Sequence, residues 1–238
     1  MPAALSIPPQ ASAAADMNAL RRTMTDCQLR TYDITDAQVL GAFETVPREK
    51  FLNPELAPLA YSDASLTVKA GAGSRVLLTP MVLARLLAAG ALKPGDRALD
   101  IGGGLGYSAA ILGALTGSVT ALEARPDFAA AAKTCLTSVG CANVMTAAGA
   151  LAAGFVGNAP YDVILLNGAV ETHYQLLFDQ LASGGRLLAI VASGGQRGRA
   201  ARAMRFEKTS SGVIGEKFLF DASAAPLEAF QPEPAFVF

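Results

Sequence analysis

One carboxylate and a group of glycines form the stretch of this chain most able to do chemistry. A short apolar run ends in Asp100, and glycines then alternate at Gly102, Gly104 and Gly106 before a helix-like run begins at Tyr107. Glycines at this spacing let the backbone pass close to a ligand. A dinucleotide-binding fingerprint, G-x-G-x-x-G, needs its third glycine at position 107, where tyrosine stands. The loop therefore predicts a ligand of another kind.

A second carboxylate stands at the end of the next strand-like run, where residues 118–122 lead into Glu123. Two acidic strand ends suit a cationic or hydroxylated ligand better than a phosphate. S-adenosylmethionine offers an ammonium group, a sulfonium and a ribose diol, and a carboxylate such as Glu123 can accept hydrogen bonds from ribose hydroxyls. The two features together predict an S-adenosylmethionine site rather than a tight turn followed by a surface glutamate.

The elements that must position these residues alternate between strand and helix. Strands are expected over residues 97–101, 119–123, 143–146, 162–166 and 185–191, and helices over residues 107–115, 126–139 and 173–181. This alternation predicts a parallel, doubly wound α/β sheet with helices on both faces. Two further strand-like runs, 203–208 and 213–220, are separated by a turn composition and predict an antiparallel hairpin at one sheet edge.

Polar residues at the strand ends are expected to form one crevice, because ligands of open α/β sheets bind outside the carboxyl ends of the strands. Asp100, Glu123 and Asn167 stand at such ends, and Gly149 lies just past a third one. The predicted cofactor-binding residues are Asp100, Gly102, Gly103, Gly104, Gly106, Glu123, Gly149 and Asn167.

The chain divides into three parts by composition and pattern. Residues 1–15 are rich in Ala, Pro and Ser and predict a disordered lead-in; they lack the basic segment of a signal peptide. Residues 16–79 predict a cap, with helices over 16–29 and 36–45 and a loop-rich segment over 51–73. Residues 80–238 predict the catalytic domain, which opens with a helix over 80–92.

Charge and composition exclude several classes of protein. The 238 residues carry 19 basic and 20 acidic side chains, so the broad positive field of a nucleic-acid-binding protein is missing. A basic cluster predicts a solvated helix face or loop, with a polyanion site as the lesser reading; it comprises Arg197, Arg199, Arg202, Arg205 and Lys208. The uncharged stretches 101–122 and 136–161 are broken by glycines and polar residues, which favours buried strands and helices over membrane spans.

Cysteine and histidine are too few for a metal centre or a disulfide framework. The chain has three cysteines without C-x-x-C spacing and a single histidine, His173, which is expected to begin a helix. We therefore expect a cytoplasmic protein with reduced thiols, no metal site, and neither a membrane nor a nucleic acid as partner.

Several motifs outside the glycine loop resemble the protein-L-isoaspartate O-methyltransferase family. They are Gln28-Leu29-Arg30, Val46-Pro47-Arg48-Glu49-Lys50-Phe51, Ala60-Tyr61-Ser62-Asp63 and Pro80-Met81-Val82-Leu83-Ala84. The second and third are specific to this family, whereas the glycine loop is shared by class I methyltransferases in general. The resemblance implies a class I fold, S-adenosylmethionine as cofactor, and isoaspartyl residues of damaged proteins or peptides as the source of the methylated carboxylate.

The resemblance also exposes two departures. The family's active-site serine lies in a Gly-Gln-Thr-Ile-Ser-Gln-Pro-like loop, and Leu78 stands at its position here. A second family piece, Gly-Asp-Gly, is Gly149-Ala150-Leu151 in this chain and lacks its acid. Leucine cannot donate a hydrogen bond to a carboxylate. We therefore expect a divergent member whose activity on isoaspartate is weak or absent.

No catalytic residue is assigned by the sequence, and two candidates remain. Thr79 is expected to cap the helix that begins at Pro80, unless it turns inward toward an acceptor. Arg75 either binds a carboxylate bidentately or is a solvated loop cation. The alternative function is a non-catalytic or differently specific S-adenosylmethionine-binding protein, and Tyr107 disfavours a third, a nucleotide-dependent oxidoreductase.

Overall fold

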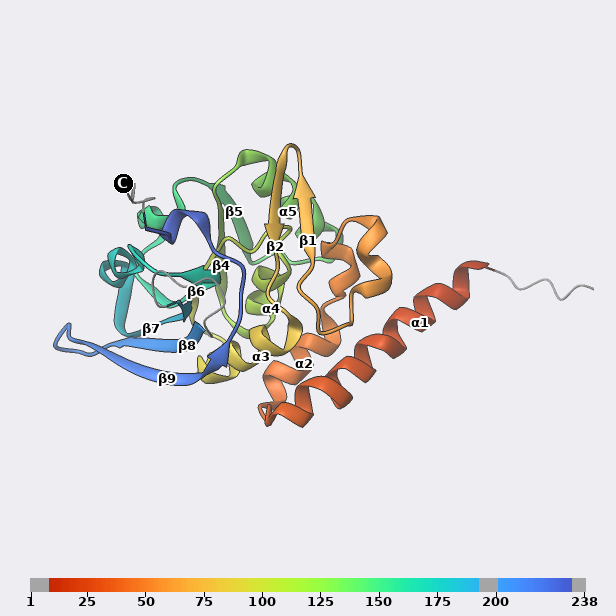
Figure 1. Cartoon of the computed structure of the whole chain (residues 1–238), viewed down its shortest axis with the longest axis horizontal. Helices are drawn as coiled ribbons and strands as arrows, with labels where there is room; N and C mark the ends of the chain where they lie inside the picture. Colours follow the sequence, from red (N-terminus) through yellow and green to blue (C-terminus); the bar gives the residue numbers. More distant parts are fainter. Residues whose placement is uncertain (1–8, 193–200, 233–238) are drawn as a thin grey trace, which may run out of the picture.

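A seven-stranded sheet forms the centre of the computed structural model, which describes residues 9–192 and 201–232 (Figure 1). Its strands are β3 (Arg97–Ile101), β4 (Ser118–Glu123), β5 (Val144–Ala148), β6 (Tyr161–Val170), β7 (Leu181–Val191), β8 (Ala201–Lys208) and β9 (Ile214–Ala222). They lie in the order β5-β4-β3-β6-β7-β8-β9. The first five strands in this order, β5, β4, β3, β6 and β7, are parallel, whereas β8 runs antiparallel to both of its neighbours. The predicted parallel sheet with a C-terminal antiparallel hairpin is thus confirmed.

The parallel strands are buried on both faces, and successive residues face different cores. On β6, Val163 and Leu165 join one apolar cluster while Ile164 and Leu166 join the other. The first cluster packs beneath the helices α3 (Pro80–Ala89), α4 (Tyr107–Leu115) and α5 (Pro126–Ser138). Such two-sided burial explains why these strands read as continuous apolar runs in the sequence.

The second face of the sheet is covered differently from what we expected. Instead of an α-helix over residues 173–181, the chain forms a 3-10 helix, η7 (Tyr174–Gln180). Only ten residues join Val170 at the end of β6 to Leu181 at the start of β7. A 3-10 helix rises about 2.0 Å per residue, against about 1.5 Å in an α-helix, and so covers more of this short return path.

The N-terminal cap is built from helices, of which α2 (Ala37–Thr45) packs on both α3 and α4. The others are α1 (Pro9–Met24), a π-helical turn (Thr25–Leu29), η2 (Arg30–Tyr32), η3 (Arg48–Phe51) and η4 (Pro54–Leu59). Asp36 caps α2 as its position predicts, since its side chain accepts from the backbone N–H groups of Gln38 and Val39. The start of α1 corrects the predicted lead-in: the alanine-rich residues from Pro9 on are helical, in keeping with the high helix propensity of alanine. Residues 1–8 lie outside the described residues.

A small hairpin was missed by the sequence analysis, which expected loop over residues 51–73. Strands β1 (Thr67–Ala70) and β2 (Gly73–Val76) pair antiparallel beside the main sheet (Figure 1). The turn between them contains Gly71 at a φ of 54°, a left-handed conformation that favours glycine. A glycine at the first position of a two-residue turn was the signal that could have revealed this hairpin.

The structure also corrects the predicted position of the basic cluster, which was expected on a helix face or loop. Arg202, Arg205 and Lys208 lie on β8 and not on a helix, while Arg197 and Arg199 lie outside the described residues. Arg205 donates to the carbonyl of Ala89 at 3.0 Å, and Lys208 donates to two carbonyls at 3.1 Å near η7. Arg205 and Lys208 therefore join β8 to α3 and to the segment around η7.

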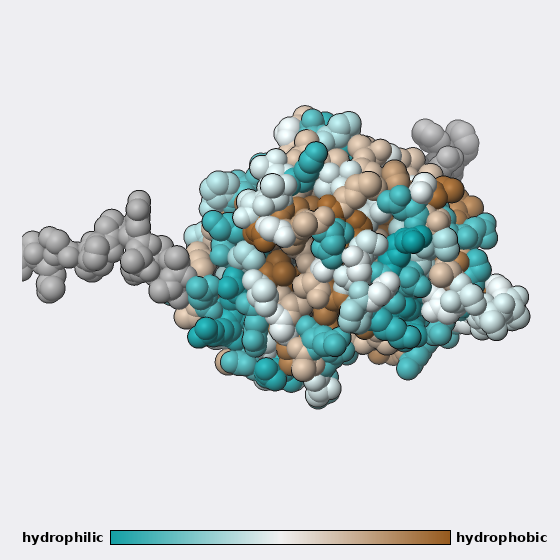
Figure 2. All heavy atoms as spheres, turned by 180° about the vertical axis from the view of Figure 1, so that it is seen from behind, coloured by the Kyte–Doolittle hydropathy of each residue, from teal (hydrophilic) through white to brown (hydrophobic). Residues whose placement is uncertain are grey.

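Most apolar side chains are internal, and the view from behind shows a largely hydrophilic or neutral surface with apolar residues gathered near its middle (Figure 2). The large apolar side chains that are most exposed, such as Val156, Val213 and Leu176, belong to different elements or loops. In the part of the chain that the structure describes, no helix combines the length and the apolar character needed to cross a membrane.

Candidate cofactor and acceptor site

Asp100 is the second-last residue of β3 and forms the buried centre of the site. Its side chain accepts hydrogen bonds from Ser108 Oγ at 2.8 Å and from Asn167 Nδ2 at 2.7 Å. Asn167, on the neighbouring strand β6, also donates to the carbonyl of Ile101 at 3.1 Å. Two predicted residues thus meet as expected. The sequence analysis missed Ser108, although its place in the first turn after the glycine loop could have suggested a contact with Asp100.

Burial changes the acidity of Asp100, which is 1% exposed. Desolvation raises the pKa of its carboxyl to about 7, and the negative charge of Glu123 acts in the same direction. The hydrogen bonds from Asn167 and Ser108 lower the pKa and offset part of this rise. A cation placed beside Asp100 would favour the ionised form, so the site is suited to a positively charged ligand group.

Glu123 ends β4 and is equally buried, and both of its carboxylate oxygens have donors. Oε1 accepts from the backbone N–H of Gly104, and Oε2 accepts from Arg75 Nη2 at 2.9 Å. Arg75 comes from β2 and is no solvated cation: it binds a carboxylate, as the first alternative held, but through one nitrogen, and that carboxylate belongs to Glu123 of this chain. A carboxylate offers about four lone-pair positions. Glu123 therefore keeps acceptor capacity for further hydroxyl donors.

The glycine loop lies between the two carboxylates and the β1–β2 hairpin. Gly102, Gly104 and Gly106 all have positive φ values, of 74°, 70° and 95°. A Cβ on Gly103 would collide with the Asp100 carboxylate and with Ser108 Oγ. A Cβ on Gly104 would meet the hairpin and the segment after it, at 3.0 Å from Leu77 Cδ2 and 3.1 Å from Val68 Cγ2. Both positions therefore require glycine, whatever ligand is bound.

The remaining predicted cofactor residues lie at the same edge of the sheet. Gly149 follows β5, and its N–H donates to the carbonyl of Glu123 at 2.9 Å. Gly106 precedes the first residue of α4 and packs close to Leu136 of α5. The carboxyl ends of neighbouring parallel strands bring these groups together. Cofactor contact by each of them stays a prediction.

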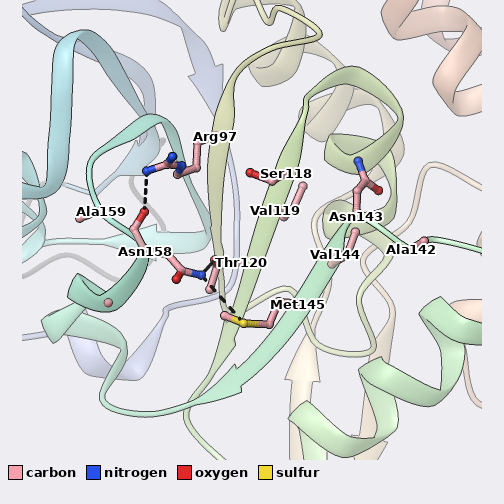
Figure 3. Close-up of a pocket in the computed structure, with 11 residues that line it drawn as sticks. Arg97, Ser118, Val119, Thr120, Ala142, Asn143, Val144, Met145, Asn158 and Ala159 are labelled. Carbon is pink, nitrogen blue, oxygen red and sulfur yellow. Dashed lines mark hydrogen bonds between the residues drawn. The ribbon is translucent and has the colours of Figure 1, made fainter.

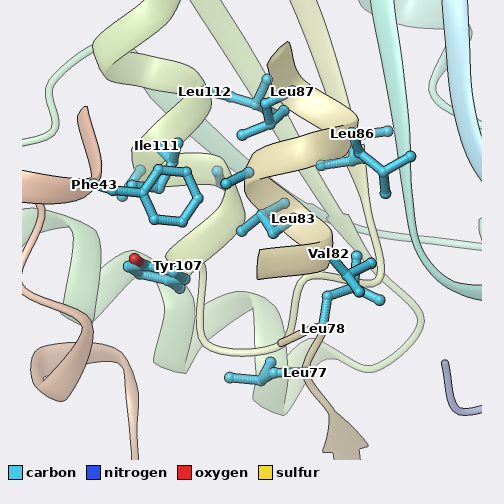
Figure 4. Packing of buried hydrophobic residues seen from close by; sticks show 14 of the residues in the cluster. Phe43, Leu77, Leu78, Val82, Leu83, Leu86, Leu87, Tyr107, Ile111 and Leu112 are labelled. Carbon is cyan, nitrogen blue, oxygen red and sulfur yellow. The ribbon is translucent and has the colours of Figure 1, made fainter. Parts of the chain in front are cut away.

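The segment between β2 and α3 forms the acceptor side and is apolar. Leu78 is buried in the cluster that includes Val82, Leu83 and Tyr107 (Figure 4). Thr79 caps α3, as predicted, because its Oγ1 accepts from the N–H of Val82 at 3.4 Å. Leu78 has no hydroxyl, and the Thr79 hydroxyl oxygen faces the start of α3.

A hollow of about 10 Å³ lies between this segment and the glycine loop. It is lined by Arg48, Leu77, Leu78, Leu83, Gly103, Tyr107, Ser108 and Asn167. That volume is at the lower limit for a single water molecule. The hollow nevertheless joins the partners of Asp100 to the position of the missing serine. Arg48, which the sequence analysis quoted within a motif but gave no role, is the only charged residue among those that line it.

A larger hollow, of about 490 Å³, opens at the opposite edge of the sheet (Figure 3). Arg97, Ser118 and Asn143 line it near the amino ends of their strands. Its polar groups bind the chain itself: Arg97 donates to the carbonyl of Asn158, and Asn158 donates to Thr120 Oγ1 at 2.9 Å. Because α/β sheets bind ligands at the carboxyl ends of their strands, size alone does not make this hollow the functional site.

The fold and the site together define the class. A parallel sheet with an antiparallel C-terminal hairpin, a glycine loop after the first strand and acidic ends on two adjacent strands constitute a class I methyltransferase fold. The sequence model of the protein-L-isoaspartate(D-aspartate) O-methyltransferase family matches residues 21–226. The chain belongs to this family.

Curated relatives agree over most of their length. A protein-L-isoaspartate O-methyltransferase of Koribacter versatilis is 39% identical over 173 residues, which are 73% of this chain and 77% of the relative. One from Picosynechococcus is 36% identical over 81% of this chain and 86% of its own. Protein-L-isoaspartate O-methyltransferase 1 of Rhodopseudomonas palustris is 34% identical over 92% and 87%, respectively.

Solved structures support the same fold. A protein-L-isoaspartate O-methyltransferase superposes with a TM-score of 0.74 and 26% identity, over 86% of this chain and 65% of that longer one. A Plasmodium falciparum protein assigned to the same family, solved with S-adenosyl-L-homocysteine, superposes with a TM-score of 0.70 over 87% of this chain and 97% of its own. Its identity of 19% shows the shared fold alone.

Proposed function

We propose that this protein is an S-adenosylmethionine-dependent O-methyltransferase that methylates a carboxylate, with isoaspartyl residues of proteins or peptides as its acceptor class. The observation that carries the proposal is the paired set of acidic strand ends, Asp100 and Glu123, on either side of the glycine loop in a chain of this family. Asp100 would face the ammonium group of the cofactor, and Glu123 would accept from its ribose hydroxyls.

The residues present suit a transfer that needs no acid or base. An acceptor carboxylate is already ionised at neutral pH. S-adenosylmethionine, when bound, supplies a methyl group on a sulfonium: its C–S bond breaks as a C–O bond forms, leaving a neutral thioether and a neutral ester. No proton moves in this step. Rate then depends on alignment and on exclusion of water, to which the apolar wall of Leu77, Leu78 and Leu83 contributes.

The replacement of the family's serine by Leu78 bears on rate rather than on class. One positioned donor in a water-excluded site is worth about 2.7–4 kcal/mol of transition-state stabilisation. Thr79 caps α3 and does not line the hollow beside Leu78, so its hydroxyl is not placed to substitute for that donor. We therefore propose that isoaspartyl methylation by this protein is slower than a serine at position 78 would allow.

The test combines cofactor binding with methyl transfer. Labelled S-adenosylmethionine is incubated with an isoaspartyl peptide and, as a matched control, the same peptide with a normal aspartyl residue; calorimetry measures cofactor affinity in parallel. The proposal expects binding together with base-labile methyl ester on the isoaspartyl peptide alone. Binding without transfer to the peptide would instead support a differently specific or non-catalytic cofactor-binding protein, and absence of binding would refute the proposal.

A further inference from the structure

Arg48, in η3, is a buried cation whose hydrogen-bonding capacity is mostly unused. It is 0% exposed, and its Nη2 donates to the carbonyl of Leu78 at 3.2 Å. Its Nε and Nη1 atoms have no hydrogen-bond partner. Within residues 16–192 and 201–232, Arg48 forms no ion pair with a carboxylate. Its charge is compensated in part by the ring of Tyr107, whose centroid lies 4.6 Å from the guanidinium carbon, and by the more distant negative charge of Asp63.

The same fold shows how a purely structural buried arginine is satisfied. Arg186 donates to the carbonyls of Gly90, Asp162 and Ala91 and forms an ion pair with Asp96, so each of its three nitrogens has a partner. Buried charges in proteins are normally paired in this way, because an unpaired buried charge costs several kcal/mol. Arg48 lacks such a partner. Its one hydrogen bond is to the carbonyl of Leu78, 30 residues further along the chain.

The unmatched donors lie beside the reaction site. Arg48 lines the small hollow together with Leu78, Gly103 and Asn167, so the guanidinium stands between the glycine loop and the position where the family has its serine. The Tyr107 hydroxyl near it is also buried without a hydrogen-bond partner. A guanidinium is the side chain best suited to bind a carboxylate, and Nε and Nη1 together carry three free N–H bonds.

We propose that Arg48 binds a carboxylate of a bound reactant. This inference rests on the proposed function, which supplies two reactants with that group: the methyl acceptor and the methionine part of the cofactor. Either one would satisfy the charge that the protein leaves unpaired. The hollow holds no more than about one water, so Leu77 and Leu78 must shift to admit the carboxylate. If the acceptor is the source, Arg48 supplies a donor where Leu78 cannot.

The experiment compares Arg48→Met, Arg48→Lys and the structural control Arg186→Met. Calorimetry measures affinity for S-adenosylmethionine and for 5′-methylthioadenosine, which keeps the nucleoside and thioether but has no carboxylate. A transfer assay gives kcat/KM for the isoaspartyl peptide, and binding of that peptide to protein loaded with S-adenosylhomocysteine is measured independently of turnover. Thermal unfolding reports the stability of each variant.

Arg48→Met is expected to stay folded, with a Tm no lower than that of the parent, because it removes a charge that has no partner. Arg186→Met is expected to lower Tm. If the carboxylate belongs to the cofactor, Arg48→Met lowers the affinity for S-adenosylmethionine about 10- to 100-fold and leaves the affinity for methylthioadenosine unchanged. If it belongs to the acceptor, both of these affinities persist and the affinity for the peptide falls by a similar factor. Arg48→Lys should recover part of either loss.

Two results would overturn the assignment. One is a fall in Tm for Arg48→Met like that for Arg186→Met, with every affinity of the folded protein unchanged, which would make Arg48 structural. The other is no change in any measurement. Failure of the proposed function can be told apart from failure of this inference. A parent protein that neither binds nor methylates the peptide still has measurable affinities for S-adenosylmethionine and methylthioadenosine. If Arg48→Met then left the ratio of these two affinities unchanged, the assignment would be refuted.

Discussion

Asp100 should make both the stability and the cofactor affinity of this protein depend on pH near neutrality. Burial raises the pKa of its carboxyl from 3.8 to about 7. Because the folded state binds the proton more tightly than the unfolded state, this group favours folding fully below the unfolded pKa, and the benefit is lost as pH rises through 7. The loss approaches about 4 kcal/mol well above pH 7, of which about 2–3 kcal/mol falls between pH 5 and pH 8.

Asp100→Asn tests this directly, because an amide can keep both hydrogen bonds: its oxygen can accept from Asn167, and its NH₂ can donate to Ser108 Oγ. Urea unfolding from pH 5 to pH 8 should show the stability of the variant rising relative to that of the parent by about 2–3 kcal/mol. Asp221→Asn, which removes an exposed carboxylate on β9, controls for the change in net charge. A parent and an Asp100→Asn variant whose stabilities stay parallel across this range would refute the shifted pKa.

The same titration should appear in binding. A cationic ammonium group favours ionised Asp100, so affinity for S-adenosylmethionine should rise by up to about fiftyfold between pH 5 and pH 7, with release of a proton on binding. Calorimetry in buffers of different ionisation enthalpy counts that proton. Asp100→Asn should bind weakly and without this dependence. If the variant matched the parent's affinity at pH 7, Asp100 would not face the ammonium group.

Three further substitutions test other parts of the site. Glu123→Ala should weaken S-adenosylmethionine binding, since ribose hydroxyls would lose an acceptor worth about 1–3 kcal/mol; unchanged calorimetric affinity in a folded variant would remove Glu123 from the site. Gly104→Val should abolish cofactor binding, because its side chain meets Leu77 and Val68 beside the Glu123 carboxylate; Gly41→Ala in α2, where a Cβ meets nothing within 4 Å, is the tolerated control. Leu78→Ser should raise turnover on an isoaspartyl peptide by up to about a hundredfold without changing cofactor affinity; a parent enzyme already as fast as the variant would show that Leu78 is no lesion.

The sequence predicted best those features that depend on local periodicity. Strand β3 and helix α4 match their expected bounds, because an apolar run that ends in Asp100 and glycines leaves little room for another assignment. Asp100 and Asn167 were placed together correctly, since the carboxyl ends of adjacent parallel strands must meet at one edge.

Contacts between segments distant in the sequence could not be predicted in the same way. The ion pair between Arg75 and Glu123 joins residues 48 positions apart through a hairpin that reads as loop, so nothing local announces it. Arg48 belongs to a motif of the family, yet the sequence could not show that its Nε and Nη1 lack hydrogen-bond partners, because this depends on the packing of distant segments. Substitution of the family's serine by Leu78 was visible in the sequence, whereas the donor beside it became visible only in three dimensions.

The β1–β2 hairpin links a small local element to the ligand site. Its strands have four residues each, and an isolated two-stranded hairpin is at best marginally stable in water, so its position depends on the groups that it contacts. Arg75 joins it to Glu123, and Val68 lies beside Gly104. A nucleoside whose ribose hydroxyls donate to Glu123 would share that carboxylate with Arg75, so one buried group would hold both the ligand and the hairpin.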